Sequence, residues 1–153
     1  MYELEAHINI RKKLKPNSRF KTAMIIFPIT DKQKEFRLGY GLYSVYFTGG
    51  FSLENLDLLD IHLYNSETKE TITLKEKTLK PRDYINNQKA IYCYEFQINE
   101  FGNFTIELQN PEVLTIKNGY NNPFSILKFI IPNRTTTQEN INLVINIQIF
   151  QAL

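Results

Sequence analysis

The chain has 153 residues, enough to bury one hydrophobic core, and we expect a single domain over residues 1–153. Its net charge of +2 argues against a protein that is basic as a whole and built to coat nucleic acid. No apolar run approaches the roughly 18 residues of a membrane span, and one cysteine cannot form an internal disulfide.

The N-terminal residues predict a strand and no leader peptide. Residues 2–10 alternate, with Tyr2, Leu4 and Ile10 on the apolar face, as in a half-buried strand. Glu3 and Glu5 interrupt any apolar core, so the segment does not read as a signal peptide. We therefore expect a cytoplasmic protein, although a protein exported without a leader peptide would show the same features.

Further strands are predicted through the first half of the chain. Residues 23–29 form a short apolar run in which Pro28 indicates a strand end or an edge position. The longest β-like run, residues 36–47, has large side chains on both faces, and its glycines suggest a bulge or a close backbone approach. Residues 52–59 fit a helical turn as well as a strand. The polar turn 65–70 predicts a hairpin between residues 58–64 and 71–79.

The second half continues the pattern. Residues 80–89 are the longest predicted loop. Two apolar runs within residues 91–110 are separated by a polar break that contains Gly102, which predicts a corner where the chain passes into the facing sheet. A strand over 113–117 and the hairpin signal Asn118-Gly119 follow. The last predicted strands cover residues 124–131 and 141–150.

About nine or ten short strands without a long helix predict an all-β, single-domain antiparallel β-sandwich. The strand order is open, so an immunoglobulin-like Greek key and a jelly roll both fit. Residues 100–106, EFGNFTI, resemble the corner before strand F in immunoglobulin-like sandwiches, which implies the fold class alone. Phe104 stands where that family has tyrosine, so the hydroxyl that defines the corner is missing.

No set of residues predicts catalysis, a metal or a cofactor. Asp60, His62 and Tyr64 share one strand face, where an Asp-His pair could orient a base, but no nucleophile motif accompanies them. An exposed polar sheet face is the plainer interpretation, because neighbouring polar residues on one face of a strand are common. His7, His62 and Cys93 lack metal-ligand spacing, and Cys93 fits a buried, inert thiol. We expect a protein that is not an enzyme.

One segment, residues 11–21, is rich in positive charge and contains no acid. Such a cluster can bind anionic polymers or lipid headgroups, whereas a solvated connection is the plainer interpretation. Its basic residues are Arg11, Lys12, Lys13, Lys15, Arg19 and Lys21. A second, weaker cluster consists of Lys75, Lys77, Lys80 and Arg82.

Several predicted strands are apolar on both faces, so something must cover the second face. A loop of the same chain, a second copy, another protein or a stacking sugar would each do so. The candidate residues are Tyr40, Tyr43, Tyr46, Tyr92 and Tyr94. We expect a non-catalytic interaction module that self-associates or binds a protein partner through this aromatic surface. The alternatives are a carbohydrate- or small-ligand-binding sandwich and a binder of anionic polymers or membranes through residues 11–21.

Overall fold

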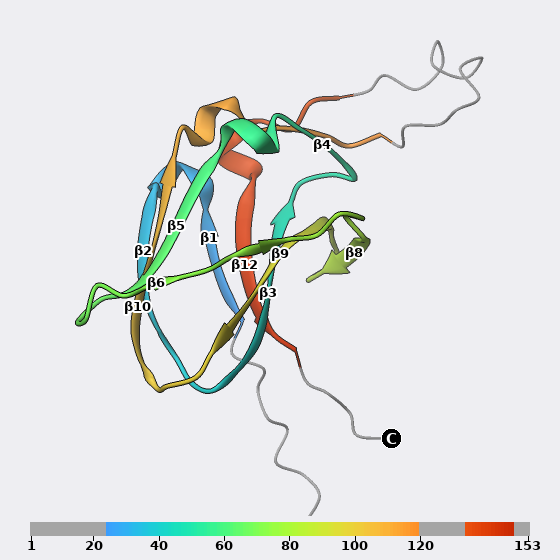
Figure 1. Cartoon of the computed structure of the whole chain (residues 1–153). Helices are drawn as coiled ribbons and strands as arrows, with labels where there is room; N and C mark the ends of the chain where they lie inside the picture. Colours follow the sequence, from blue (N-terminus) through green and yellow to red (C-terminus); the bar gives the residue numbers. More distant parts are fainter. Residues whose placement is uncertain (1–23, 120–133, 149–153) are drawn as a thin grey trace, which may run out of the picture.

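Two antiparallel sheets face each other in the computed structural model, which describes residues 24–119 and 134–148 (Figure 1). The first sheet has six strands in the order β1-β12-β3-β9-β7, with β8 also paired to β9. The second has four strands in the order β2-β10-β5-β6, and β11 and β4 form a separate pair. The prediction of an all-β antiparallel sandwich is confirmed at this level.

Most strands are short, and 3-10 turns are the helical elements of the described residues. The six-stranded sheet contains β1 (Ile25–Pro28), β3 (Gly41–Thr48), β7 (Lys75–Glu76), β8 (Arg82–Ile85), β9 (Gln88–Ile98) and β12 (Asn142–Ile147). The other sheets contain β2 (Gln33–Leu38), β4 (Ser52–Glu54), β5 (Asp60–Asn65), β6 (Thr71–Ile72), β10 (Gly102–Gln109) and β11 (Thr115–Lys117). The 3-10 turns are η1 (Ile29–Asp31), η2 (Leu56–Leu58), η3 (Pro111–Val113) and η5 (Gln138–Asn140). The strands predicted over 2–10 and 124–131 lie outside the described residues.

Two runs predicted as single strands are divided, because the chain crosses between the sheets within them. Residues 36–47 split into β2 and β3 at residues 39–40, and residues 71–79 split into β6 and β7. These divisions help to give twelve strands in the described residues, more than the nine or ten expected.

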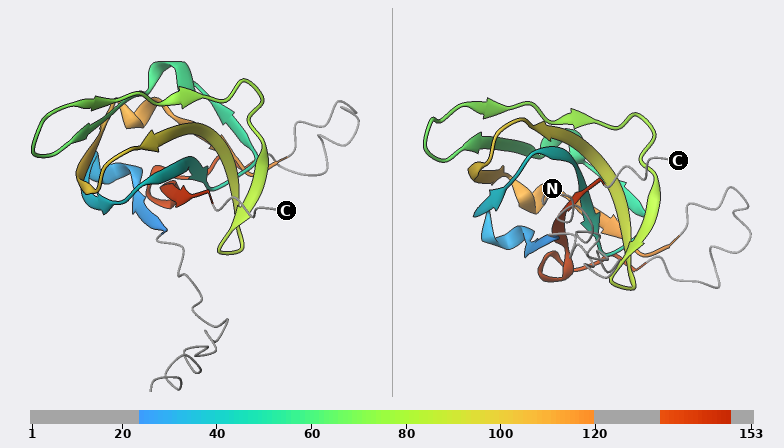
Figure 2. Two further views of the ribbon diagram at one scale, coloured as in Figure 1. Left: turned by 60° about the horizontal axis from the view of Figure 1, so that its bottom comes forward. Right: turned by 90° about the horizontal axis from the view of Figure 1, so that it is seen from below.

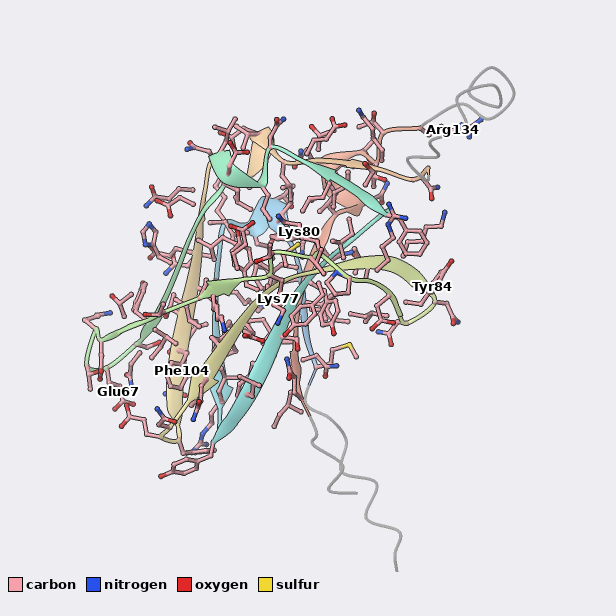
Figure 3. The ribbon with its side chains drawn as sticks, turned by 45° about the vertical axis from the view of Figure 1, so that its right-hand side comes forward. Glu67, Lys77, Lys80, Tyr84, Phe104 and Arg134 are labelled. Atoms are coloured by element: carbon pink, nitrogen blue, oxygen red, sulfur yellow. The ribbon has the colours of Figure 1, made fainter. Side chains whose placement is uncertain are left out.

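The prediction of a loop over residues 80–89 was wrong, because these residues contain β8. A two-residue turn joins β8 to β9, with Asn86 at φ 49° and Asn87 at φ 62°. Positive φ at both central positions is the type I′ geometry that suits the twist of a hairpin. The β8–β9 hairpin projects at one end of the sheet (Figure 2), and Tyr84 of β8 lies at the surface (Figure 3).

Other local predictions are confirmed. β5 pairs with β6 across the 65–70 turn, with Leu63 opposite Ile72. The chain leaves the six-stranded sheet at the end of β9 and enters the four-stranded sheet at Gly102, as the corner in residues 91–110 predicted. Residues 52–59 resolve into β4 followed by the turn η2.

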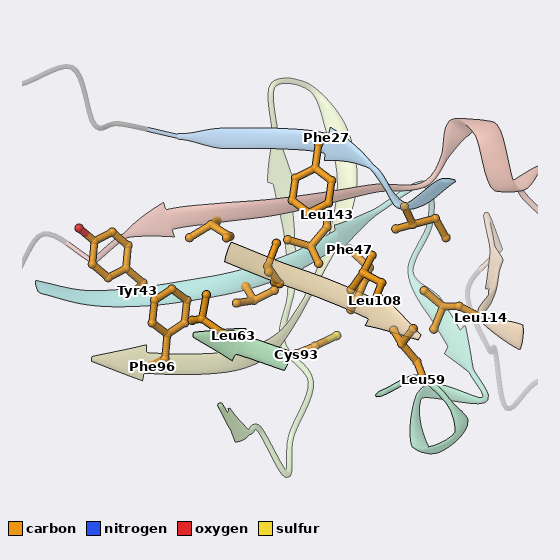
Figure 4. Close-up of a cluster of buried hydrophobic side chains, with 14 of the residues drawn as sticks. Phe27, Tyr43, Phe47, Leu59, Leu63, Cys93, Phe96, Leu108, Leu114 and Leu143 are labelled. Atoms are coloured by element: carbon orange, nitrogen blue, oxygen red, sulfur yellow. The ribbon is translucent and has the colours of Figure 1, made fainter. Parts of the chain in front are cut away.

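The core fills the space between the two facing sheets (Figure 4). Phe47 of β3 and Leu143 of β12 approach from one side, and Phe104 and Ile106 of β10 approach from the other. All four side chains are fully buried. Burying a side chain of this size stabilises the fold by about 1.5–3 kcal/mol, so this layer supplies much of the free energy that holds the sheets together.

A β-bulge in β9 explains why residues 91–98 look apolar on both faces. Tyr46 of β3 pairs with Tyr92, whereas its neighbour Val45 pairs with Tyr94, so β9 carries one extra residue between the two pairs. The extra residue shifts the alternation, and apolar side chains before and after the bulge face the same core. These side chains are Ile91, Cys93, Phe96 and Ile98.

A tyrosine hydroxyl fixes the crossing from β2 to β3. Tyr43 donates a hydrogen bond of 3.0 Å to the carbonyl oxygen of Gly39, four residues upstream, and its ring stacks on Phe96 with centroids 5.2 Å apart. In immunoglobulin-like sandwiches a corner tyrosine bonds its upstream backbone in the same manner. The sequence resemblance pointed to Phe104 for that corner, whereas the bond is made at another crossing between the sheets.

We expect Tyr43→Phe to lower the free energy of unfolding by about 1 kcal/mol, because the Gly39 carbonyl loses its donor while the ring keeps its packing. Urea denaturation measures the difference. Tyr40→Phe is the matched control, because the Tyr40 side chain is 72% exposed and should give no measurable loss. Equal stability of the two variants would refute a structural role for the Tyr43 hydroxyl.

Candidate functional site

The five candidate tyrosines lie in different parts of the sandwich. Tyr43 is buried in the core, and Tyr94 packs against the core at the bulge, where burial raises the pKa of its hydroxyl. Tyr40 is exposed at the crossing between β2 and β3. Tyr46 and Tyr92 are the two that the structure brings together, with stacked rings whose centroids are 5.0 Å apart.

Tyr46 and Tyr92 belong to a row of side chains that crosses four strands on the outer face of the six-stranded sheet. Each of its residues is paired directly with the next one on the neighbouring strand, from β1 through β12 and β3 to β9. We call it the tyrosine row, and it consists of Ile26, Val144, Tyr46 and Tyr92. The adjacent row in the same register, which includes Phe27 and Phe47, faces the core, so the tyrosine row points away from it. Sequence reasoning missed Ile26 and Val144, because only the strand order makes them neighbours of the tyrosines.

The chain covers part of this outer face itself. Val144 is fully buried in a small second cluster with Ile85 of the β8–β9 hairpin and with Ala90, and Met24 and Tyr46 pack against it. Ile26, at the end of the row, is 43% exposed. The tyrosine row is therefore a partly covered apolar surface with an open end on β1.

A hydrogen-bond network holds the Tyr92 ring in place. Its hydroxyl donates to Glu95 Oε2 at 3.2 Å and accepts from Gln148 Nε2 at 2.6 Å. Lys77 donates to the same Glu95 carboxylate at 3.0 Å, and Lys75 lies 3.4 Å from it. The bond from Lys77, together with that from Tyr92, lowers the pKa of Glu95 against the opposing effect of desolvation.

The outer face of the four-stranded sheet is polar. His62 Nε2 lies 3.0 Å from Asp60 Oδ2, and Tyr64 donates a 2.7 Å hydrogen bond to Glu107, which raises the pKa of the Tyr64 hydroxyl. A depression of about 470 Å³ is lined by His62, Tyr64, Glu107 and three further residues, none of which is a serine or cysteine. Asp60 and His62 are about half exposed. This face has the wetted character usual for an antiparallel sheet, in contrast to the tyrosine row.

No family model matches the sequence, and comparison with curated proteins and with solved structures finds no match. The candidate site therefore rests on the geometry of this chain.

Cys93 has the character of a core residue. Its side chain is fully buried, its Sγ lies 3.5 Å from the carbonyl oxygen of Ile91, and burial raises the pKa of the thiol to about 12. A thiol with that pKa is protonated at neutral pH and is a poor nucleophile. In the part of the chain that the structure describes, no group of three histidine, cysteine or acidic side chains could hold a metal ion. Within the same residues, no helix is long and apolar enough to cross a membrane.

The two basic clusters lie in different parts of the chain. The first, residues 11–21, lies outside the described residues. In the second, Lys75 and Lys77 share Glu95, and Lys80 lies 2.8 Å from Glu76. Arg82 donates its Nε hydrogen to the carbonyl oxygen of Phe51. Lys75, Lys77 and Lys80 therefore each take part in an ion pair, with two carboxylates among them, which weakens the second cluster as an anion-binding patch.

A second depression, of about 570 Å³, lies between the β8–β9 hairpin and the segment 134–142. Neither depression is lined by two tyrosines, the arrangement that the sequence suggested for a carbohydrate-binding sandwich. None of the five candidate tyrosines lines either of them.

Proposed function

We propose that the chain is a non-catalytic interaction module that self-associates or binds a protein partner through the tyrosine row. The observation that carries this proposal is the difference between the two outer faces of the sandwich. The outer face of the four-stranded sheet is polar where Asp60 and Glu107 lie. The outer face of the six-stranded sheet carries Tyr46, Tyr92 and Ile26 in one row. Apolar and aromatic groups on one face alone are typical of a protein-binding surface.

The tyrosine row has properties that favour binding at low entropic cost. Tyrosines are enriched among the residues that contribute most to protein interfaces. Stacking on Tyr46 and the bonds to Glu95 and Gln148 already restrict the Tyr92 ring, so little side-chain freedom is lost when a partner covers it. Lys75, which is 77% exposed, lies beside this network, where a charged rim residue would influence partner choice.

Light scattering after size-exclusion chromatography, over a range of protein concentrations, tests self-association. We expect the mass of the native chain to rise with concentration. Ile26→Glu places a charge at the open end of the row, so we expect it to raise the dissociation constant at least about tenfold. Gln33→Glu is the matched control, because Gln33 is exposed on β2 of the other sheet and should leave association unchanged.

A heterologous partner is tested by photo-cross-linking. A photoreactive amino acid at position 26 should give a defined adduct in the native host, and Ile26→Glu expressed in excess should not compete for it, whereas the native chain should. The same label at position 33 should give no such adduct. A monomer at all concentrations, together with no adduct specific to position 26, would reject the proposal.

A further inference from the structure

The depression beside the β8–β9 hairpin has a strongly polar lining. Its four carboxamides come from Gln88, Asn118, Asn140 and Asn142. Three consecutive threonines, 135–137, contribute hydroxyls. Lys89 and Arg134 add positive charge, and Glu139 adds one carboxylate. We call this depression the amide groove.

Hydrogen bonds between distant segments build the amide groove. Thr136 donates its hydroxyl to the carbonyl oxygen of Gly49 at 2.6 Å and its backbone N–H to that of Ile116 at 2.7 Å. Lys89 Nζ donates to Asn118 O at 3.0 Å and to Asn118 Oδ1 at 2.8 Å, and Asn118 N–H donates to the carbonyl oxygen of Arg134 at 3.0 Å. These bonds fix four separate segments around one open space, which is a preformed arrangement.

The balance of hydrogen-bonding groups indicates the class of ligand. Carboxamides and hydroxyls both donate and accept, and Glu139 only accepts. A simple anion offers acceptors alone, so it would provide no donor for the amide oxygens of Gln88, Asn140 and Asn142 and would be repelled by Glu139. Ligand hydroxyls suit this mixture of donors and acceptors, because each hydroxyl can donate and accept at once.

An aromatic ring stands beside the groove. Tyr84 pairs directly with Lys89 across the β8–β9 hairpin, and its side chain is 58% exposed. Its ring is held edge-on against Phe51, with centroids 5.2 Å apart. Tyr84 and Arg134 lie toward the same side of the molecule in Figure 3. An exposed, fixed ring of this kind can stack against the apolar face of a sugar.

We propose that the amide groove binds a saccharide chain, with its hydroxyls on the carboxamides and threonines and one sugar ring on Tyr84. This goes beyond the proposed function and does not depend on it, because the groove contains no member of the tyrosine row. The sequence suggested ligand binding at the five candidate tyrosines, whereas the site proposed here consists of different residues.

Titration of the full chain, followed by backbone amide NMR shifts, tests the site with four hexasaccharides: maltohexaose, cellohexaose, chitohexaose and the acidic hexaguluronate. We expect at least one to give saturable shifts at residues 88–89, 118 and 134–140, with a dissociation constant of about 1 mM. Response to hexaguluronate alone would assign the acidic subclass, with Arg134 binding a carboxylate and the carboxamides and threonines binding the hydroxyls.

Variants separate a built site from general surface contact. Arg134→Ala and Gln88→Ala remove exposed groups from the lining, and each should weaken binding several-fold to about tenfold. Gln109→Ala, in the depression on the other sheet, is the matched control and should bind as the native chain does. Ile26→Glu should also bind normally, which distinguishes this site from the tyrosine row. Absence of saturable shifts at about 10 mM of every hexasaccharide, ten times the expected dissociation constant, or equal binding by all variants, would overturn the proposal.

Discussion

Phe104→Ala is expected to lower the free energy of unfolding by about 4 kcal/mol, the typical cost of removing a large aromatic side chain from a core. Phe104 is fully buried between the sheets, in register with Phe36 of β2 and Asn65 of β5. Its loss would leave a cavity at the start of β10, just after the chain enters the four-stranded sheet. Since domains of this size are stable by about 5–15 kcal/mol, the variant should unfold at a much lower urea concentration.

Phe101→Ala is the matched control for this result. Phe101 lies three residues earlier, is 58% exposed and stacks under Arg37, whose guanidinium is 4.2 Å from the ring centroid. Its removal should cost about 0.5–1 kcal/mol, the value of an exposed cation–π contact. Similar losses in the two variants would mean that Phe104 does not occupy the core position described. Urea midpoints with unchanged slopes would give both values.

Local sequence signals predicted the parts of the fold that depend on neighbours in the chain. The 65–70 turn and the corner before Phe104 were found because polar breaks and glycine interrupt apolar alternation over a few residues. The turn at Asn86-Asn87 was not predicted from the sequence. Asparagine adopts positive φ less readily than glycine, so residues 80–89 read as a loop although they contain β8.

The sequence could not reveal features that depend on pairing between distant strands. The alternation in residues 91–98 is interpreted correctly only if one residue is assigned to a bulge, and the bulge is defined by the partners Val45 and Tyr46 in β3. Without it, one strand looked apolar on both faces, and Tyr94 seemed to share a surface with Tyr92.

The candidate sites show the same limit. Ile26 and Tyr92 are 66 positions apart, yet they belong to one row because β12 and β3 lie between their strands. The amide groove unites Gly49, Asn118 and the threonines 135–137, which no spacing motif connects. An apolar or polar character can be predicted from each segment, whereas the surface on which the segments meet requires the strand order.

Gly50→Ala should lower the free energy of unfolding by about 3 kcal/mol, the upper part of the range for forcing an extra atom into a packed site. A Cβ atom on Gly50 would collide with the backbone carbonyl of Lys117 and lie 2.8 Å from Ile116 Cγ2. The carbonyl cannot move freely, because Phe51 N–H donates to it at 3.2 Å and β11 is paired to β4 in the same place. The substitution must therefore push β11 away from the end of β3.

This displacement has a consequence for the amide groove, since Asn118 follows Lys117 and accepts hydrogen bonds from Lys89. Amide shifts in Gly50→Ala should therefore be concentrated at residues 116–118 and 134–137. Gly102→Ala is the matched control: the nearest atom to its added Cβ would be 3.5 Å away, and its stability should change by no more than about 0.5 kcal/mol. If the two alanine variants were equally stable, the close passage of β11 over Gly50 would be wrong, and with it the position of Asn118 in the groove.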